Sequence, residues 1–326
     1  MILATWFYSS PLGENFSYPS VGNNSSDESF QTCYFKCVID FFASSYVNNI
    51  ELLNSGSLRH IFYCNKIPSY VDAFSFYILM RILRVEIRDF KPVKIPKFSK
   101  ELDLVFGSVF SQLDVLEALA LDIDDNDFVY LLDNDVIVNK SLKYRQDDYL
   151  NNPVVLKQQS GDLKQFIQGN SLSSLMLISE KITRNINLKA YRSYVHTGGE
   201  LVAMSGASLK KFSDMCNLIY KENNLLQSNS EDFYQTEEQI FSCAYTCFQS
   251  IYFCNYINRI WTDASKYRTV DGSENELTFL HIPSEKRSGF QKLSEQTHAC
   301  IDNDVLDFEK LRLVFDFENI KQVCNL

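Results

Sequence analysis

The strongest constraint on the fold is the segment 128–138, where five apolar residues lead into two aspartates spaced one residue apart. The run Phe128–Leu132 is too short for an isolated helix and predicts a central strand that is covered on both faces. Because side chains alternate along an extended backbone, Asp133 and Asp135 emerge on the same side. Two carboxylates at the end of a buried strand suit magnesium or manganese, which keep positions open for water and substrate phosphates. The segment therefore predicts a divalent-metal site for a diphosphate substrate.

Composition limits the classes of protein to which this site can belong. The chain has 326 residues, of which 45% are hydrophobic, so it can bury a large core in one domain or in one domain with an elaboration. A net charge of −10 argues against nonspecific nucleic-acid binding, which needs a basic face. The nine cysteines are scattered and odd in number, which is typical of reduced thiols in a cytosolic protein. No apolar run approaches the length of a membrane span, so we expect a cytoplasmic protein without a transmembrane segment.

Strand and helix patterns alternate along the chain. We expect strands at 2–8, 60–64, 85–90, 128–132, 194–204, 250–254 and 278–282, and helices at 30–47, 71–83, 108–121, 164–177, 207–220 and 234–247. Parallel strands require crossover connections, so this order predicts an α/β layer on a mostly parallel sheet. Ligands then bind at the carboxyl edge of the strands. The sequence leaves the oligomeric state open.

Several downstream residues are candidates to complete the metal site. His281 ends an apolar strand, and a neutral imidazole is a common third ligand beside two carboxylates. Lys286 and Arg287 follow closely and are suited to neutralise charge on a departing diphosphate. These three residues also have simpler interpretations. A single histidine is more often a core or surface residue than a metal ligand. If His281 is not a ligand, Lys286 and Arg287 are surface charges.

Two further segments carry polar groups that can face a substrate. In the segment 194–200, Gly198 and Gly199 allow close approach of the backbone to a ligand, although a β-bulge explains them about as well. Glu237 and Glu238 belong to an acidic cluster at the start of a predicted helix, where carboxylates are favoured by the dipole and can orient an acceptor hydroxyl. Helix capping is the simpler explanation for this pair.

Together these residues resemble the GT-A class of nucleotide-sugar glycosyltransferases, particularly the retaining enzymes of glycosyltransferase family 8. In that family an Asp-x-Asp strand end holds manganese, a later glycine-containing strand lines the pocket, and a late His followed by Lys completes the site. Asp133 with Asp135, the segment 196–200, and His281 with Lys286 correspond to these three motifs in the same order. The chain departs from the family at Gln112, where members often carry a basic residue.

The resemblance implies a Rossmann-like GT-A domain over residues 1–289 and a mainly helical C-terminal tail over 290–326. It implies manganese or magnesium held by Asp133, Asp135 and His281, a UDP-sugar donor, and a glycan or other hydroxyl acceptor for a hexosyl- or pentosyltransferase. The implied donor-binding residues are Ala4, Thr5, Tyr8, Asn134, Gly198, Gly199 and Lys286, and the implied catalytic residues are Glu237, Glu238 and Lys286.

Two other classes of protein share parts of this pattern. Phosphohydrolases and phosphotransferases with an aspartyl nucleophile also open with Asp-x-Asp after an apolar strand, but usually near the N-terminus and with a second acidic pair that has no clear equivalent here. A non-catalytic carbohydrate-binding module would keep the fold and lose the metal site. The presence of Asp133, Asp135 and His281 together argues against such a module.

Overall fold

The computed structural model describes residues 1–14, 16, 25–71, 73–94, 107–142, 152–156, 163–263, 265 and 267–326. Its centre is a seven-stranded sheet with spatial order β10-β6-β9-β4-β1-β2-β3. These strands are β1 (Ile2–Phe7), β2 (Arg59–Cys64), β3 (Val85–Arg88), β4 (Phe128–Leu132), β6 (Val154–Val155), β9 (Leu201–Ser205) and β10 (Tyr252–Phe253). Only β9 runs antiparallel to its neighbours, so the mostly parallel sheet predicted from the sequence is confirmed.

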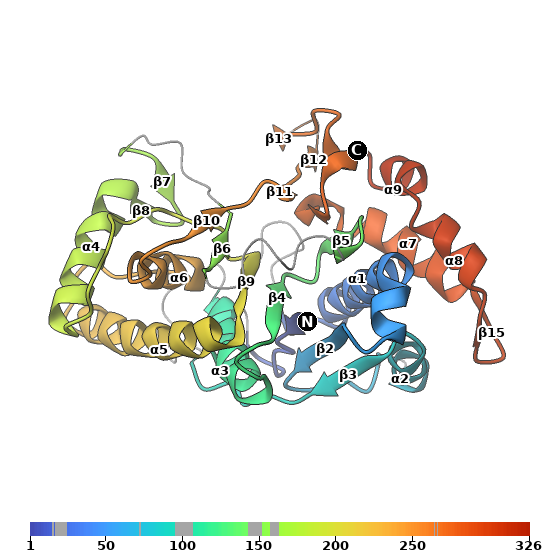
Figure 1. The fold of residues 1–326 in the computed structure, drawn as a ribbon, viewed down its shortest axis with the longest axis horizontal. Helices are drawn as coiled ribbons and strands as arrows, with labels where there is room; N and C mark the ends of the chain where they lie inside the picture. The colour runs from blue at the N-terminus through green and yellow to red at the C-terminus, as the bar shows by residue number, and fades with distance from the viewer. Residues whose placement is uncertain are drawn as a thin grey trace.

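Helices cover both faces of this sheet (Figure 1), as parallel strands with crossover connections require. On one side lie α3 (Ser111–Asp122), α4 (Leu172–Asn185), α5 (Gly206–Ser228) and α6 (Glu237–Thr246). On the other lie α1 (Glu28–Asn54), α2 (Ala73–Ile82), α7 (Gly289–His298), α8 (Phe308–Val314) and α9 (Phe317–Val323). None of the helices in the described part of the chain combines the length and apolar character that crossing a membrane requires.

The two cores follow from the alternation of side chains along β1. Leu3 and Phe7 pack into the cluster beneath α1, whereas Ile2 and Ala4 pack into the cluster beneath α3 and α5. The C-terminal helices contribute Phe290 and other apolar side chains to the α1 cluster. The region predicted as a helical tail therefore packs on the same core as the sheet.

A smaller sheet lies beside the end of β4 and is made of β11 (Ile257–Arg259), β14 (Phe279–His281) and β5 (Val136–Val138). Within the described ranges there are also three two-stranded hairpins: β7 (Phe166–Ile167) with β8 (Asn170–Ser171), β12 (Thr262–Asp263) with β13 (Tyr267–Arg268), and β15 (Ile301–Asp302) with β16 (Val305–Leu306). The part of the chain that the structure describes also contains the short 3-10 helices η1 (Gly107–Phe110), η3 (Glu274–Glu276) and η4 (Pro283–Glu285).

Two predicted elements begin well after the residue at which the sequence places them. The helix expected at 164–177 begins only at Leu172, because Gln168 and Gly169 both adopt left-handed φ values of 44° and 88° and form the turn of the β7–β8 hairpin. The strand expected at 194–204 is regular only over Leu201–Ser205. The preceding residues are irregular, with Gly198 donating a backbone hydrogen bond to Leu156 instead of extending the ladder.

Candidate active site

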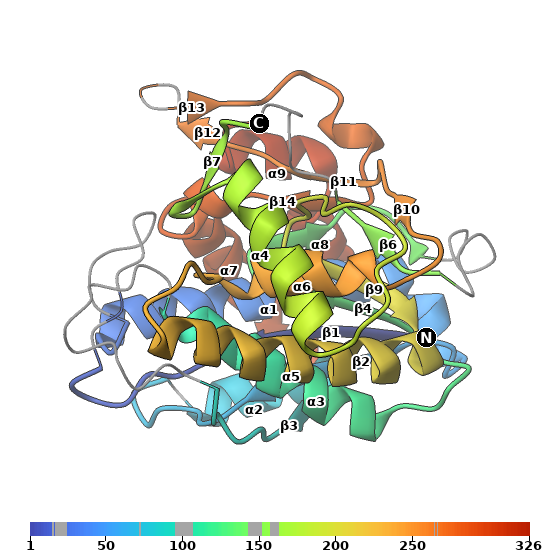
Figure 2. The same cartoon turned by 90° about the vertical axis from the view of Figure 1, so that its left-hand side faces the viewer.

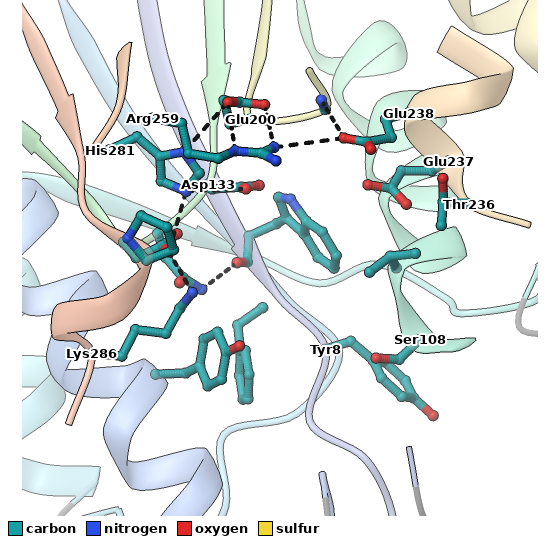
Figure 3. Close-up of a pocket in the computed structure, with 18 of the residues that line it drawn as sticks. Tyr8, Ser108, Asp133, Glu200, Thr236, Glu237, Glu238, Arg259, His281 and Lys286 are labelled. Carbon is teal, nitrogen blue, oxygen red and sulfur yellow. Dashed lines mark hydrogen bonds and ion pairs between the residues drawn. The ribbon is translucent and has the colours of Figure 1, made fainter. Parts of the chain in front are cut away.

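A cavity of about 210 Å³ lies at the carboxyl ends of β1 and β4, the edge at which α/β sheets bind ligands. Aromatic side chains from the segments 6–8 and 30–34 line part of its wall. Figure 2 shows the whole fold turned by a quarter, with α4 and α6 lying in front of the sheet. The charged residues that line the cavity, most of them drawn in Figure 3, are Asp133, Asp135, Glu200, Glu237, Glu238, Arg259, His281 and Lys286.

The two aspartates occupy the connection between β4 and β5. Asp133 follows the last residue of β4, and its backbone N–H donates to the Glu200 carbonyl at 3.3 Å. Asn134, between them, donates from its side chain to the Trp6 carbonyl at 3.0 Å, which ties the connection to β1. Asp135 is buried, whereas the Asp133 side chain is one third exposed in the cavity.

His281 and Lys286 converge on the same aspartate oxygen. Antiparallel pairing of β14 with β5 places His281 opposite Val136, next to Asp135. His281 Nε2 lies 3.2 Å from Asp135 Oδ2 and 3.8 Å from Asp133 Oδ2, and the Lys286 ammonium donates to the same Asp135 oxygen. One ligand atom from each of Asp133, Asp135 and His281 can be chosen so that all three lie within 4.8 Å of one another.

Glu200 and Arg259 form a second layer behind the histidine. Because β9 is antiparallel to β4, its first residue Leu201 pairs with Leu132, and Glu200 therefore lies beside the aspartates. Arg259 donates two hydrogen bonds to the Glu200 carboxylate, at 3.0 and 2.8 Å. Glu200 Oε1 also lies 3.5 Å from His281 Nδ1, so it orients the imidazole from the side opposite Asp135.

The first turn of α6 forms a third part of the wall. Glu238 accepts a hydrogen bond from the Gly199 backbone at 3.2 Å and lies 3.3 Å from His196 and 3.6 Å from Arg259. Glu237 lies next to it and is buried, and its Oε2 has no hydrogen-bond partner among the described residues. Glu237 packs this closely against residue 199 because that residue is a glycine. A Cβ at position 199 would lie 2.9 Å from Glu237 Oε1, which is closer than real Cβ contacts.

Burial and neighbouring charges set the protonation of these groups. For Asp135, burial opposes ionisation, but Lys286 and His281 outweigh it and lower the pKa of the carboxyl. Burial and the Asp135 charge raise the pKa of Asp133 to about 6. Burial also acts against the charged form of His281, but Asp135 and Glu200 raise its pKa to about 9. Burial and the Glu238 charge raise the pKa of Glu237 well above its usual range, which favours the protonated form of this acid.

The Asp133, Asp135 and His281 cluster fits a divalent cation. Two carboxylates and an imidazole suit a divalent transition metal such as manganese better than magnesium, which prefers oxygen ligands, and the three ligand atoms already converge. Without a cation, His281 and Lys286 supply the positive charge that neutralises Asp135. A bound cation would replace the proton on His281 in this balance.

The structure brings most of the predicted site residues to one cavity. The predicted residues that line it are Tyr8, Asp133, Asn134, Asp135, Gly199, Glu237, Glu238, His281 and Lys286. Ala4 and Thr5 do not line it, because Ala4 packs in the core and the Thr5 hydroxyl donates to the Leu132 carbonyl inside the sheet. The strand therefore presents Trp6, Phe7 and Tyr8 to the cavity instead. Gly198 is also absent from the lining.

Sequence reasoning missed several residues of the cavity. Arg259 is the single charge in an apolar stretch, 256–261, which is a signal that a buried counter-charge exists but does not identify it. Glu200 ends the glycine-containing segment 194–200, and the sequence there gives it no role of its own. Aromatic residues such as Trp6, Tyr34 and Trp261 line the cavity, but their types are equally common in cores.

No protein-family model matches the chain, and no curated protein matches it. Solved glycosyltransferase structures are similar to it at low identity. The galactosyltransferase LgtC in complex with donor and acceptor sugar analogs is 13% identical, with a TM-score of 0.46 over 86% of this chain and 87% of that one. An active-site mutant of LgtC gives a TM-score of 0.48 with the same identity and coverage.

A third structure, the bifunctional glycosyltransferase WbbM in its apo form, is 9% identical with a TM-score of 0.45. The match covers 98% of this chain and 49% of WbbM. All three neighbours are glycosyltransferases, the class that the sequence resembles. The likeness is distant, so the function proposed below rests on the geometry of the cavity.

Proposed function

We propose that this protein is a metal-dependent glycosyltransferase that moves a hexosyl or pentosyl group from a nucleoside-diphosphate donor to a hydroxyl of a glycan or other acceptor. The observation that carries the proposal is the convergence of Asp133, Asp135 and His281 with Lys286 in a cavity that is also lined by aromatic side chains. Uridine diphosphate sugars are the usual donors of the family that the sequence resembles, and we propose one here.

The residues of the cavity divide into groups with separate tasks. A manganese or magnesium ion held by Asp133, Asp135 and His281 would stabilise the negative charge of the nucleoside diphosphate. Lys286 has its ammonium beside Asp135 and is placed to neutralise the same diphosphate as it departs. Trp6 and Tyr8 offer flat faces on which a nucleobase can stack.

The acidic wall is suited to hold sugar hydroxyls. Glu237 is buried, lines the cavity and has one oxygen without a hydrogen-bond partner among the described residues. Burial and the Glu238 charge raise its pKa and so favour the protonated form, which can donate one hydrogen bond and accept another. Glu238 and Glu200 are both engaged with Arg259, so their charges are compensated before a substrate arrives. We propose that Glu237 and Glu238 orient the hydroxyl groups of the substrates.

Transfer with retention of anomeric configuration is part of the proposal. Glu200 and Glu238 are held in ion pairs, and the raised pKa of Glu237 favours its protonated form, so the described residues of this wall offer no free carboxylate nucleophile. The acceptor hydroxyl would therefore attack on the face from which the diphosphate leaves. The departing phosphate would take the proton of the acceptor.

The test is a manganese-dependent screen of nucleoside-diphosphate sugars, with release of nucleoside diphosphate as the readout. We expect Asp135→Asn and His281→Ala to lower turnover at least about a hundredfold, since each removes part of the charge stabilisation. Asp124→Asn changes an exposed aspartate outside the cavity and is the matched control. Folding of each variant is checked by circular dichroism.

Two results would contradict the proposal. Unchanged turnover in a folded Asp135→Asn protein would remove the metal site from the reaction. Release of inorganic phosphate from phosphomonoesters, with no dependence on a sugar donor, would indicate the aspartyl phosphohydrolase class instead.

A further inference from the structure

Lys286 belongs to a loop that follows β14 and borders the cavity. The loop covers residues 282–289, and we call it the lysine loop. His281 ends β14 immediately before it, and Pro283 and Lys286 both line the cavity. A lysine side chain is a flexible four-carbon stem, so the place of its ammonium depends on how firmly the backbone beneath it is held.

Glu285 is a buried carboxylate whose hydrogen bonds come from three separate parts of the chain. Its Oε1 accepts from the Thr262 hydroxyl in β12 and from the Asn325 side chain at 3.3 Å. Its Oε2 accepts from the Ser288 hydroxyl and from the Gly289 backbone N–H, the latter at 3.1 Å. All four donors are uncharged, and the residue is only 4% exposed. A carboxylate in such a setting acts as an anchor for the segments that donate to it.

The anchoring segments are themselves tied together. Arg268 in β13 donates to the Thr262 carbonyl at 3.1 Å and to the Asn325 carbonyl at 3.0 Å. Thr262 donates from its backbone to the Ser284 hydroxyl at 3.1 Å. Figure 1 and Figure 2 show the chain's C-terminus beside β12, which agrees with these contacts. The β12–β13 hairpin and the last residues of the chain therefore meet at the lysine loop.

The loop is packed tightly enough for this anchor to fix its path. A Cβ at Gly289 would lie 3.1 Å from Glu285 Oε2 and 2.7 Å from Cys324 Sγ, so there is no space for the loop to shift toward the C-terminal helices. On the other side, the Ile282 N–H donates to the Asp135 carbonyl at 3.0 Å. The loop is thus held at one end by the metal-site backbone and at the other by the Glu285 carboxylate.

We propose that Glu285 is a positioning residue that fixes the lysine loop so that Lys286 lies against Asp135, and that Asn325 and Thr262 act through it. This inference rests on the proposed function, since it concerns how Lys286 is presented to the donor diphosphate. Glu285 does not line the cavity, so it acts on the reaction only through its neighbour. A misplacement of about 1 Å at a reacting group can lower a rate by about a hundredfold.

The experiment compares Glu285→Ala with Glu285→Gln. The Ala variant removes all four hydrogen bonds, whereas the Gln variant keeps the shape and one acceptor oxygen. We expect Glu285→Ala to lower kcat by about ten- to a hundredfold with less than about a threefold change in KM for the donor. We expect Glu285→Gln to recover at least half of this loss on a logarithmic scale. Glu276→Ala, an exposed glutamate nearby, is the control.

Two measurements do not depend on turnover. Manganese affinity, measured by titration calorimetry, stays within about twofold in Glu285→Ala, because no proposed metal ligand changes. Hydrogen exchange of the amides at 286–289 becomes at least about tenfold faster, whereas exchange in β1 and β4 is unchanged. Asn325→Gly, which keeps the left-handed φ of 57° and removes a single hydrogen bond, gives a smaller change in the same direction if Glu285→Ala does not fold.

The outcomes separate this inference from the proposed function. Wild-type kcat in folded Glu285→Ala, or a loss of manganese affinity equal to the loss of kcat, would overturn the positioning role. An absence of sugar transfer in the wild-type protein counts against the proposed function, and the exchange experiment then decides the inference alone. In that case unchanged exchange at 286–289 overturns it, and faster exchange confined to the lysine loop supports it.

Discussion

Replacing Arg259 by methionine tests whether the charged wall of the cavity is held as a buried ion-pair network. Arg259 compensates Glu200, which is fully buried, and lies 3.6 Å from Glu238. Methionine fills similar volume without charge, so Arg259→Met leaves a buried carboxylate without its main counter-ion. Removing one partner of a buried pair typically costs about 3–5 kcal/mol. Glu200 keeps His281 at 3.5 Å, so we expect a value near the lower end, about 3 kcal/mol.

The double variant Glu200→Gln with Arg259→Met makes the prediction specific. Both charges are then absent, so the loss should be smaller than the sum of the two single losses by at least about 2 kcal/mol. Arg312→Met is the matched control, because Arg312 pairs with Glu309 on the exposed surface and such pairs contribute about 1 kcal/mol or less.

The measurement is urea denaturation, followed by circular dichroism and tryptophan fluorescence together to check that the two transitions coincide. A typical domain is stable by about 5–15 kcal/mol, so a loss of about 3 kcal/mol is well resolved. A buried ion-pair network is refuted if the unfolding free energy of Arg259→Met lies within about 1 kcal/mol of the wild-type value. It is also refuted if the unfolding free energy lost by the double variant equals the sum of the two single losses.

Three further predictions concern single positions. Gly199→Ala places a Cβ 2.9 Å from Glu237 Oε1. We expect kcat/KM to fall about tenfold and the unfolding free energy to change by less than about 1 kcal/mol. Wild-type kcat/KM in this variant would contradict the close packing of Glu237 and Glu238 against Gly199. Gly206→Ala places a Cβ 2.0 Å from the Asp124 backbone carbonyl and should destabilise the fold by at least about 1–3 kcal/mol in urea, which a wild-type midpoint would disprove. Burial lowers the pKa of His60 to about 4 in the folded protein. Between about pH 6.5 and 4, His60 therefore takes up a proton in the unfolded chain but stays neutral in the folded one. Up to about 3 kcal/mol of the unfolding free energy should be lost as pH falls through this range. Denaturation across this range should show a flatter profile in His60→Gln, and identical profiles would contradict it.

Much of the fold is encoded in local patterns. The five apolar residues 128–132 predicted a buried strand and the segment 2–8 predicted a first strand, and the structure confirms both as β4 and β1. The predicted helix at 164–177 was wrong over its first half, because the Gln168–Gly169 turn depends on left-handed backbone conformations that an apolar pattern does not reveal. The positions of Asp133, Asp135 and their strand followed from local sequence in the same way.

The sequence by itself determined the strand that ends in Asp133 and Asp135, and it marked His281 and Lys286 as their candidate partners. Tertiary structure alone decided that Glu200 and Arg259 stand behind His281. Their meeting depends on antiparallel β9 and on the β11–β14–β5 sheet, which pair segments more than a hundred residues apart in places. Periodicity reports which face of a strand is buried, whereas the choice of a distant strand partner is made by packing of the whole core, so no local pattern could specify it.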